Sequence, residues 1–435
     1  MQVPAADTDR EVLYEIDGRR YEAGTPGFSQ AIAEAHARRQ RLRCLCRHGN
    51  GAAGTAGAAA PTAREMYVAR LAGPHGGYTV KRMPETGSQH APGCPSYESP
   101  ADLSGLGQVL GSAISENPAT GETALRLDFA MSKLPGRAAQ PPAGSEHDSV
   151  ATDGTRLTLR GLLHYLWDQA GLTRWQPGFA GRRNWAVVRK LLLQGAENKT
   201  MHDDPLLARL YVPEMFTLEH REAIDARRRQ AWTSLATAPG KPQPLMLMIG
   251  EVKEILPARY GFKAVVKHLP DLPLLLDEQL HRRLGRRFEA ELALWGASDD
   301  LHMVMVATFG LGPARVPALQ VLSLMPVTRE WLPVEDASEK QLVERLVAEG
   351  RSFVKGLRYN LNGEHAIASA VLTDSDGDAS LYIDGGDGAC VLTAPDRSAG
   401  DEVWVWNPCS APMPALPAIS SRRNTWMPES VSSGG

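Results

Sequence analysis

The first hundred residues alternate hydrophobic and polar positions in short runs, which is the spacing of β-strands with one buried face. A hairpin is predicted at 14–21, where Asp17-Gly18 supplies the turn. Residues 49–61 are almost entirely Ala and Gly, so they predict a flexible insertion without side chains to pack. The pattern therefore predicts a small β-rich module over residues 1–100, with a helix at 28–42 and strands at 66–71 and 78–83 that turn at Gly76-Gly77.

Residues 156–236 change to apolar positions three and four apart, the spacing of amphipathic helices, and no strong strand signal interrupts them. Asp203-Asp204-Pro205 predicts a helix start, because proline suits the first helical turn. Before this helical module, residues 101–155 predict a hairpin and then a linker, since the stretch from 134 is rich in Pro, Ala, Gly and Ser. Helices are predicted at 157–170, 184–195 and 218–233.

Residues 243–410 alternate strand-like and helix-like stretches, which predicts a mixed α/β domain. The tail over 411–435 is rich in Pro and Ser and is expected to be flexible. The chain as a whole is therefore predicted to be an α+β protein of several domains. Strands are predicted at 245–255, 262–269, 302–308, 319–327, 352–359, 367–373, 380–384 and 402–406, and helices at 277–295 and 338–350.

Composition and charge exclude several classes of protein. A length of 435 residues suits two to four domains, and 43% hydrophobic residues can supply their cores. The 47 Lys and Arg nearly balance 50 Asp and Glu, which excludes a uniformly basic nucleic-acid coat. The longest apolar stretches, near 245–249 and 301–311, are far shorter than the roughly 18–20 residues that span a bilayer. The polar N-terminus lacks the apolar core of a secretory signal, so we expect a cytoplasmic protein without membrane contact.

Three of the five cysteines cluster with a histidine, whereas five are too few for a disulfide scaffold. The pattern is Cys44-x-Cys46, then 43 residues, then His90-x-x-x-Cys94. Residues two apart on an extended segment point to the same side, so both sulfurs of the first pair can reach one ion. A Pro-Gly step inside the second pair predicts a turn that brings its imidazole back toward its thiol.

One imidazole and three thiolates suit tetrahedral Zn²⁺ with all four positions filled, so the site is predicted to be structural zinc. The alternative is a set of buried cysteines beside a hydrogen-bonded histidine, and His48 or His75 could replace His90 as fourth ligand. A redox role for the first pair is disfavoured, because a disulfide across one residue is strained. Cys390 and Cys409 have no histidine nearby in sequence and are interpreted as ordinary thiols.

Several strings in the chain carry a family resemblance: CLC, MYVARL, YTVKRMPETGSQHAPGCPSYE, LTLRGLLHYLWDQAGLTRW and RSFVKGLRYN. They resemble an uncharacterised bacterial family, a domain of unknown function defined by three N-terminal cysteines, over most of the chain. Cys44, Cys46 and Cys94 match the three hallmark cysteines. Members are often encoded on integrative and conjugative elements, so the resemblance implies a mobile-element context, with conjugation proteins as partners, and no established activity.

The predicted helix at 338–350 and the three strands after it are similar in order to the core of PD-(D/E)xK nucleases. That chemistry needs an Asp at the second strand and an acid two residues before a lysine on the third, which together hold Mg²⁺ and activate water. Here Ala368-Ser369 stands at the first place, and the third strand lacks the lysine. The alternative hypothesis is therefore a divergent, catalytically degenerate Mg²⁺-dependent nuclease that would use Asp374 and Asp384; on balance we expect no enzyme.

Basic residues gather on predicted helices and could neutralise phosphates, although the whole chain is slightly acidic. The opposing interpretation is that they are solvated and paired with acidic neighbours. Together with the cysteine cluster, they favour a zinc-stabilised accessory protein of a mobile genetic element that binds DNA or a partner protein. The candidate DNA contacts are Arg182, Arg183, Arg189, Lys190, Arg282 and Arg283.

Overall fold

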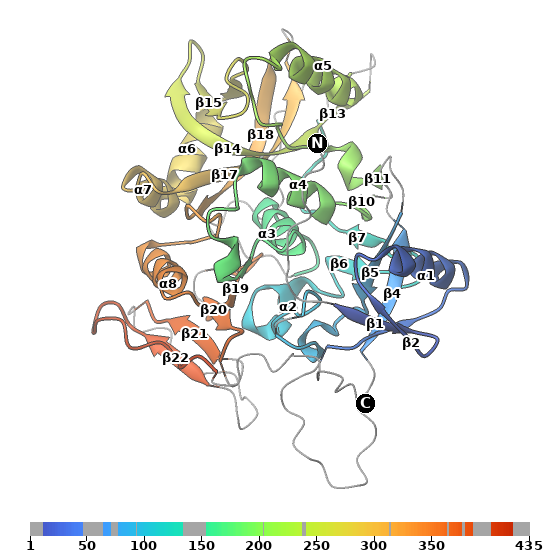
Figure 1. Cartoon of the computed structure of the whole chain (residues 1–435). Helices are drawn as coiled ribbons and strands as arrows, with labels where there is room; N and C mark the ends of the chain where they lie inside the picture. The colour runs from blue at the N-terminus through green and yellow to red at the C-terminus, as the bar shows by residue number, and fades with distance from the viewer. Residues whose placement is uncertain are drawn as a thin grey trace, which may run out of the picture.

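The computed structural model has an α+β architecture, with helices and sheets along the whole chain (Figure 1). Four predicted features fall outside the described residues: the insertion at 49–61, the turn residue Gly76, the linker over 134–153 and the tail from 421. The structure describes residues 12–46, 64–70, 77–92, 94–133, 154–202, 204–236, 241–312, 315–362, 365–375, 379–385 and 402–420.

The N-terminal part is a five-stranded antiparallel sheet in the order β2-β1-β3-β4-β5, with α1 packed against it. Asp17 and Gly18 take φ values of 50° and 73°, the backbone of a two-residue hairpin turn, which confirms the hairpin predicted there. The helix ends earlier than predicted, because the chain turns at Arg39, with φ of 52°, to enter β3. The elements are β1 (Leu13–Ile16), β2 (Arg19–Glu22), α1 (Pro26–Ala37), β3 (Leu42–Cys44), β4 (Glu65–Arg70) and β5 (Tyr78–Arg82).

The three helices predicted in the middle of the chain are all present, and two begin at a capping side chain. Thr158 Oγ1 accepts a hydrogen bond from the Gly161 N–H at 2.9 Å, and Asn184 Oδ1 accepts one from the Val187 N–H at 3.1 Å. The helices are α3 (Leu159–Gln169), α4 (Trp185–Gly195) and α5 (Arg221–Ala231).

Short strands interrupt this helical part, contrary to the prediction from sequence. Asp204 and Pro205 pair with β10 and lead into a 3₁₀ turn, so the helix start predicted there is wrong. Strands of two or three residues are too short to show a periodic pattern in the sequence. Most of them are strands because they pair with a segment far away in the chain, as β10 pairs in parallel with β7. The additional elements are α2 (Leu106–Val109), β6 (Ile114–Glu116), β7 (Thr123–Leu125), β8 (Ser132–Lys133), β9 (Arg174–Trp175), β10 (Lys199–Met201), β11 (Asp204–Pro205), β12 (Leu210–Tyr211) and β13 (Gln243–Pro244).

Five strands after residue 245 close into a barrel. The order around it is β14-β15-β16-β18-β17 and back to β14, because the first half of β14 pairs with β17 and its second half with β15. Neighbours are antiparallel except β16 and β18, which pair in parallel at Leu275 and Ala318. The four longer strands confirm the prediction, whereas β16 was not predicted. They are β14 (Met246–Pro257), β15 (Phe262–Val266), β16 (Leu274–Leu276), β17 (His302–Leu311) and β18 (Pro317–Val327).

Alternate strand residues and the apolar face of α6 fill the barrel, with Leu280 and Leu284 buried among them. The single helix predicted at 277–295 is instead two helices, α6 (Glu278–Arg287) and α7 (Glu289–Gly296). They meet at Phe288, whose ring is buried in the barrel core and whose backbone leaves helical geometry, with φ of −118° and ψ of 32°.

One hydrophobic core joins the middle helices to one side of the barrel. It contains residues of α3 and α4 together with outward-facing residues of β14, β17 and β18, among them Leu247, Val304 and Val327. No residue of β15 or β16 belongs to this core among the described residues. The two strands therefore form the side of the barrel that α3 and α4 do not cover.

The last sheet has the order β22-β21-β20-β19-β9 and lies beside α8 at the lower left of Figure 1. Three of its strands form an antiparallel meander, and β22 pairs in parallel with β21. The predicted order of one helix and three strands is present, but a nuclease-like fold is not confirmed by it. The elements are α8 (Ala337–Ala348), β19 (Phe353–Lys355), β20 (Ala370–Leu372), β21 (Ala379–Ile383) and β22 (Val403–Trp406).

Residues 411–420, the first part of the tail predicted to be flexible, contact this sheet and α8. Arg345 donates to the Met413 carbonyl at 3.2 Å, and the Trp404 Nε1–H donates to the Ala415 carbonyl at 2.9 Å. Met413 packs against the core of this sheet. These ten residues therefore have defined partners in the fold.

Candidate metal centre

The four predicted ligands come from two loops of the N-terminal part. Cys44 is the last residue of β3, and its N–H donates to the Arg64 carbonyl beside β4 at 2.9 Å, so the sheet positions the first pair. Cys46 follows two residues later. His90 ends a short 3₁₀ turn, and Cys94 lies one further turn along the chain.

The ligand atoms converge, with all four within 4.8 Å of one another. The Cys44 and Cys94 sulfurs are 3.7 Å apart, and His90 Nδ1 lies 3.5 Å from Cys46 Sγ and 3.7 Å from Cys94 Sγ. Three of the residues are buried and Cys46 is half-buried. The predicted set is therefore brought together, and it forms a group that could hold one metal ion.

Backbone amides support two of the sulfurs. The Ala91 N–H donates to Cys46 Sγ at 3.5 Å, and the Ser96 N–H donates to Cys94 Sγ at 3.4 Å. Hydrogen bonds of this kind favour the charged thiolate, which is the form that binds metal ions.

Two arginines brace the loops from outside. Arg64 donates to the Gln89 carbonyl at 2.6 Å and also to the Cys46 carbonyl, so it ties the first loop to the second. Arg174, from β9 of another sheet, donates to the Cys94 carbonyl at 3.0 Å. The ligand loops are thus connected to each other and to the rest of the molecule.

The three thiols lie so close together that their pKa values differ. The pKa of the Cys46 thiol is lowered, mainly because Cys44 and Cys94 donate hydrogen bonds to its sulfur. The pKa of the Cys44 thiol is raised, mainly by its hydrogen bond to Cys46. Burial, and next the neighbouring Cys44, raises the pKa of Tyr14, whose phenol stays neutral. Of the three thiols, Cys46 is therefore the one that loses its proton first.

A family model described as "Protein of unknown function (DUF1173)" matches residues 14–409, a range that includes all four ligands. The chain belongs to this family. No curated protein and no solved structure matches it. Among the described residues of this DUF1173 chain, no helix has the length and apolarity needed to cross a membrane.

The other predicted sulfur and nitrogen ligands lie away from the cluster or beyond what is described. His48, His75 and Cys390 fall outside the described residues. Cys409 is a free, exposed thiol after β22. His90 is fully buried with its Nδ1 at the sulfurs, so in the DUF1173 structure it is the histidine that completes the group.

Some of the predicted DNA contacts have exposed side chains, whereas others donate hydrogen bonds to backbone carbonyls of the protein. Arg182 before α4, Lys190 on α4 and Arg282 on α6 are exposed, whereas Arg283 is half-buried. Arg183 donates to the Leu172 carbonyl at 3.1 Å and also to the carbonyls of residues 174 and 330, so its guanidinium is engaged within the protein. Arg189 donates to a carbonyl as well, that of residue 212, at 3.0 Å.

The two carboxylates of the nuclease hypothesis have structural partners. Asp374 accepts hydrogen bonds from Arg351 at 2.7–3.2 Å and from the Ser352 N–H at 2.7 Å. Asp384 accepts one from the Asn407 amide at 3.2 Å. Both carboxylates therefore bind side chains or backbone of the C-terminal sheet. The loop 376–378 of this sheet lies outside the described residues.

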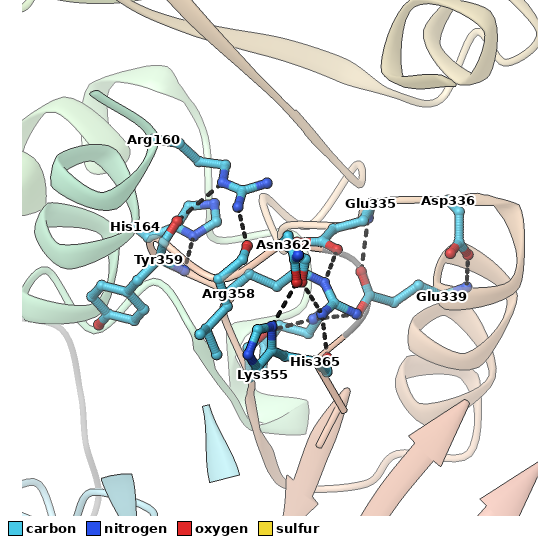
Figure 2. A network of polar contacts seen from close by, with 12 residues as sticks. Arg160, His164, Glu335, Asp336, Glu339, Lys355, Arg358, Tyr359, Asn362 and His365 are labelled. Atoms are coloured by element: carbon cyan, nitrogen blue, oxygen red, sulfur yellow. Dashed lines mark hydrogen bonds and ion pairs between the residues drawn. The ribbon is translucent and has the colours of Figure 1, made fainter. Parts of the chain in front are cut away.

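A second polar cluster, which sequence reasoning missed, joins α3, α8 and β19 (Figure 2). Lys355 Nζ donates to Glu339 Oε1 at 2.6 Å and to the next carbonyl at 2.7 Å. The Tyr359 N–H donates to His164 Nδ1 at 2.9 Å, and Arg160 donates to the Tyr359 carbonyl at 3.0 Å. The sequence carries no signal for this cluster beyond isolated charged residues in apolar helices.

Proposed function

We propose that this DUF1173 chain is a zinc-stabilised accessory protein of a mobile genetic element and that it acts by binding, with DNA as its partner. A protein of the same element is the partner to be considered if DNA is not bound. Zinc in the Cys₃His group would be structural, because three thiolates and one imidazole fill a tetrahedral shell and leave no open position.

The observation that carries the zinc assignment is the spacing of the ligand atoms. With Zn–S bonds of about 2.3 Å and a Zn–N bond of about 2.0–2.1 Å, a tetrahedral ion separates two sulfurs by about 3.8 Å and a sulfur from the nitrogen by about 3.5 Å. The Cys44–Cys94 sulfur distance is 3.7 Å, and His90 Nδ1 lies 3.5 and 3.7 Å from two sulfurs. These three separations support a zinc ion in the group.

The zinc proposal is tested by metal analysis of the full chain purified without added metal. We expect one zinc per chain, and loss of most of it in Cys94→Ser together with a lower melting temperature. Cys409→Ser is the matched control, because it removes an exposed thiol outside the group and should keep both zinc and stability. Wild-type protein that contains no zinc, and gains no stability from added zinc, would contradict the assignment.

The DNA proposal is tested by titrating a fluorescent duplex at two salt concentrations. Replacing Arg182, Lys190 and Arg282 by Ala should weaken binding and reduce the salt slope by roughly 0.9 for each phosphate that the protein no longer neutralises. The matched control replaces three exposed arginines of the N-terminal sheet, Arg19, Arg20 and Arg70, for the same change in net charge. Absence of binding at both salt concentrations would exclude DNA as the partner.

A further inference from the structure

The barrel formed by β14 to β18 has a specific connectivity. Numbered one to five along the chain, its strands run 1-2-3-5-4 and back to 1, with the third and fifth parallel. A helical segment, α6 and α7, lies between the third and fourth strands and inserts apolar side chains into the barrel. A closed five-stranded Greek-key barrel with these features is the OB-fold, which binds oligonucleotides or oligosaccharides across its second and third strands and the two flanking loops.

The corresponding strands here are β15 and β16, on the side that α3 and α4 do not cover. Their register aligns three outward-facing residues, Leu256, Lys263 and Leu275, in one row across the face. All three are partly exposed. The face therefore offers a shallow apolar strip with a lysine at its centre.

The loop between the first and second strands carries an exposed aromatic ring. Tyr260, at the tip of the β14–β15 loop, is 81% exposed, and the Arg259 guanidinium lies 5.4 Å from its ring centroid. Next to the loop, the rings of Phe262 and His281 stack at 3.4 Å, which brings the start of α6 to the same end of the face. An exposed tyrosine has no role in the packing of the barrel.

Basic residues lie at both ends of the strip, although Asp277 and Glu278 are also exposed at the end near Tyr260. Arg259 and Lys263 lie on the loop and the face, and exposed Arg315 lies in the loop between the fourth and fifth strands, at the other end of β16. Lys253 is also exposed, although Glu254 lies 3.9 Å from its Nζ. The arrangement complements a chain of phosphates, with an aromatic ring available for a base.

We propose that this face binds single-stranded nucleic acid, with a base stacked on Tyr260 and phosphates held by Arg259 and Lys263. The inference deepens the proposed DNA-binding function by naming a ligand form and a surface, and it is independent of the metal centre. A single strand fits better than a duplex, because stacking on a side chain needs an unpaired base. A neutral oligosaccharide has no charge to match the basic residues.

The test is a titration of the full chain with a fluorescent oligo(dT). Tyr260→Ala should weaken binding about tenfold, whereas Tyr260→Phe, which keeps the ring, should bind like wild type. Arg259→Ala with Lys263→Ala should reduce the salt slope by about 1.4, at about 0.7 per neutralised phosphate for single strands. Leu218→Ala is the matched control, because Leu218 is also 81% exposed but lies in the loop before α5.

The outcomes separate this inference from the broader proposal. If Tyr260→Ala binds oligo(dT) like wild type, the stacking surface is wrong; if duplex binds and oligo(dT) does not, the inference fails while DNA binding stands. Binding of neither form contradicts both. Photocrosslinking with a bromodeoxyuridine oligonucleotide gives an independent readout: the crosslinked peptide should contain Tyr260, and crosslinks confined to other parts of the chain would overturn the assignment.

Discussion

Lys355 and Glu339 form an ion pair in which the residues are only 3% and 6% exposed. The Glu339 carboxylate also accepts a hydrogen bond from the Glu335 N–H at 2.7 Å, so both of its oxygens are used. Burial raises the pKa of this carboxyl, and the lysine opposes that effect. Each member of the pair therefore compensates the cost of burying the other.

Removing one member should destabilise the protein more than removing both. Lys355→Met leaves a buried carboxylate without its cation, and we expect a loss of about 3–5 kcal/mol in the free energy of unfolding. Glu339→Leu combined with Lys355→Met should recover most of that loss. Urea unfolding of the wild type, the two single variants and the double variant measures the coupling. A single Lys355→Met variant within about 0.5 kcal/mol of wild type would contradict this role.

His164 should make the stability depend on pH. Its Nδ1 accepts the Tyr359 N–H, and burial holds its pKa well below the usual value of about 6.5, so it is neutral in the folded chain. As pH falls below about 6.5, His164 binds a proton in the unfolded chain but stays neutral in the folded chain. The free energy of unfolding should then fall by up to about 1.4 kcal/mol per pH unit, with no such term at higher pH.

The control for this term is His164→Asn, in which an amide oxygen can accept the same N–H but does not titrate. Urea unfolding of both proteins at pH 7.5, 6.5 and 5.5 gives the comparison, and other titrating groups cancel in the difference. The wild type should lose more stability than the variant between pH 6.5 and 5.5. Parallel losses in the two proteins would show that His164 contributes nothing to the pH dependence.

At the scale of elements, several helix starts could be predicted because their signals are local, although the one at 203–205 was wrong. Asp277 accepts a hydrogen bond from the Leu280 N–H at 2.6 Å, at the start of a helix predicted from the same residue. We expect Asp277→Ala to lower the free energy of unfolding by about 1 kcal/mol and Asp277→Asn to retain most of the stability, as measured by urea unfolding. Equal losses in both variants would show that the cap is not the cause.

Elements defined by distant partners could not be predicted. β16 has three residues and exists because β15 and β18 lie on either side of it. The closure of the barrel depends on the pairing of β14 with β17, from Val252 with Met303 to Met246 with Phe309, and no periodic pattern records that pairing. The long strands were predicted, but the barrel, and with it the face around Tyr260, became visible only in the structure.

The metal group could be predicted because its residue types are chemically distinctive. Cys44, Cys46 and Cys94 stand out in a chain of five cysteines, although β3, the strand that ends at the first pair, was not among the predicted strands. The predicted DNA contacts were less reliable, because the sequence does not show whether the guanidinium of an arginine is exposed or bound within the protein. Arg183 illustrates this, since it binds backbone carbonyls inside the fold while its neighbour Arg182 is exposed.

At the scale of the whole molecule, the metal group is connected to the C-terminal sheet. Arg174 of β9 donates to the Cys94 carbonyl at 3.0 Å, and β9 pairs with β19, where Trp175 lies opposite Phe353. Val354 of β19 packs against the core that contains the metal group. Loss of the proposed zinc ion should therefore loosen β9 and β19 in addition to the N-terminal sheet.

We expect chelation of bound zinc to increase amide exchange in β9 and β19 as well as in the N-terminal sheet, while β17 and β18 of the barrel keep their protection. The reason is that disordering the ligand loops removes the carbonyl that Arg174 binds and the core that Val354 packs against, whereas the barrel has its own core. Hydrogen exchange followed by mass spectrometry, with and without chelator, measures each segment. Faster exchange confined to residues 12–98 would mean that the metal stabilises only its own module, and equal change in the barrel would indicate global unfolding instead.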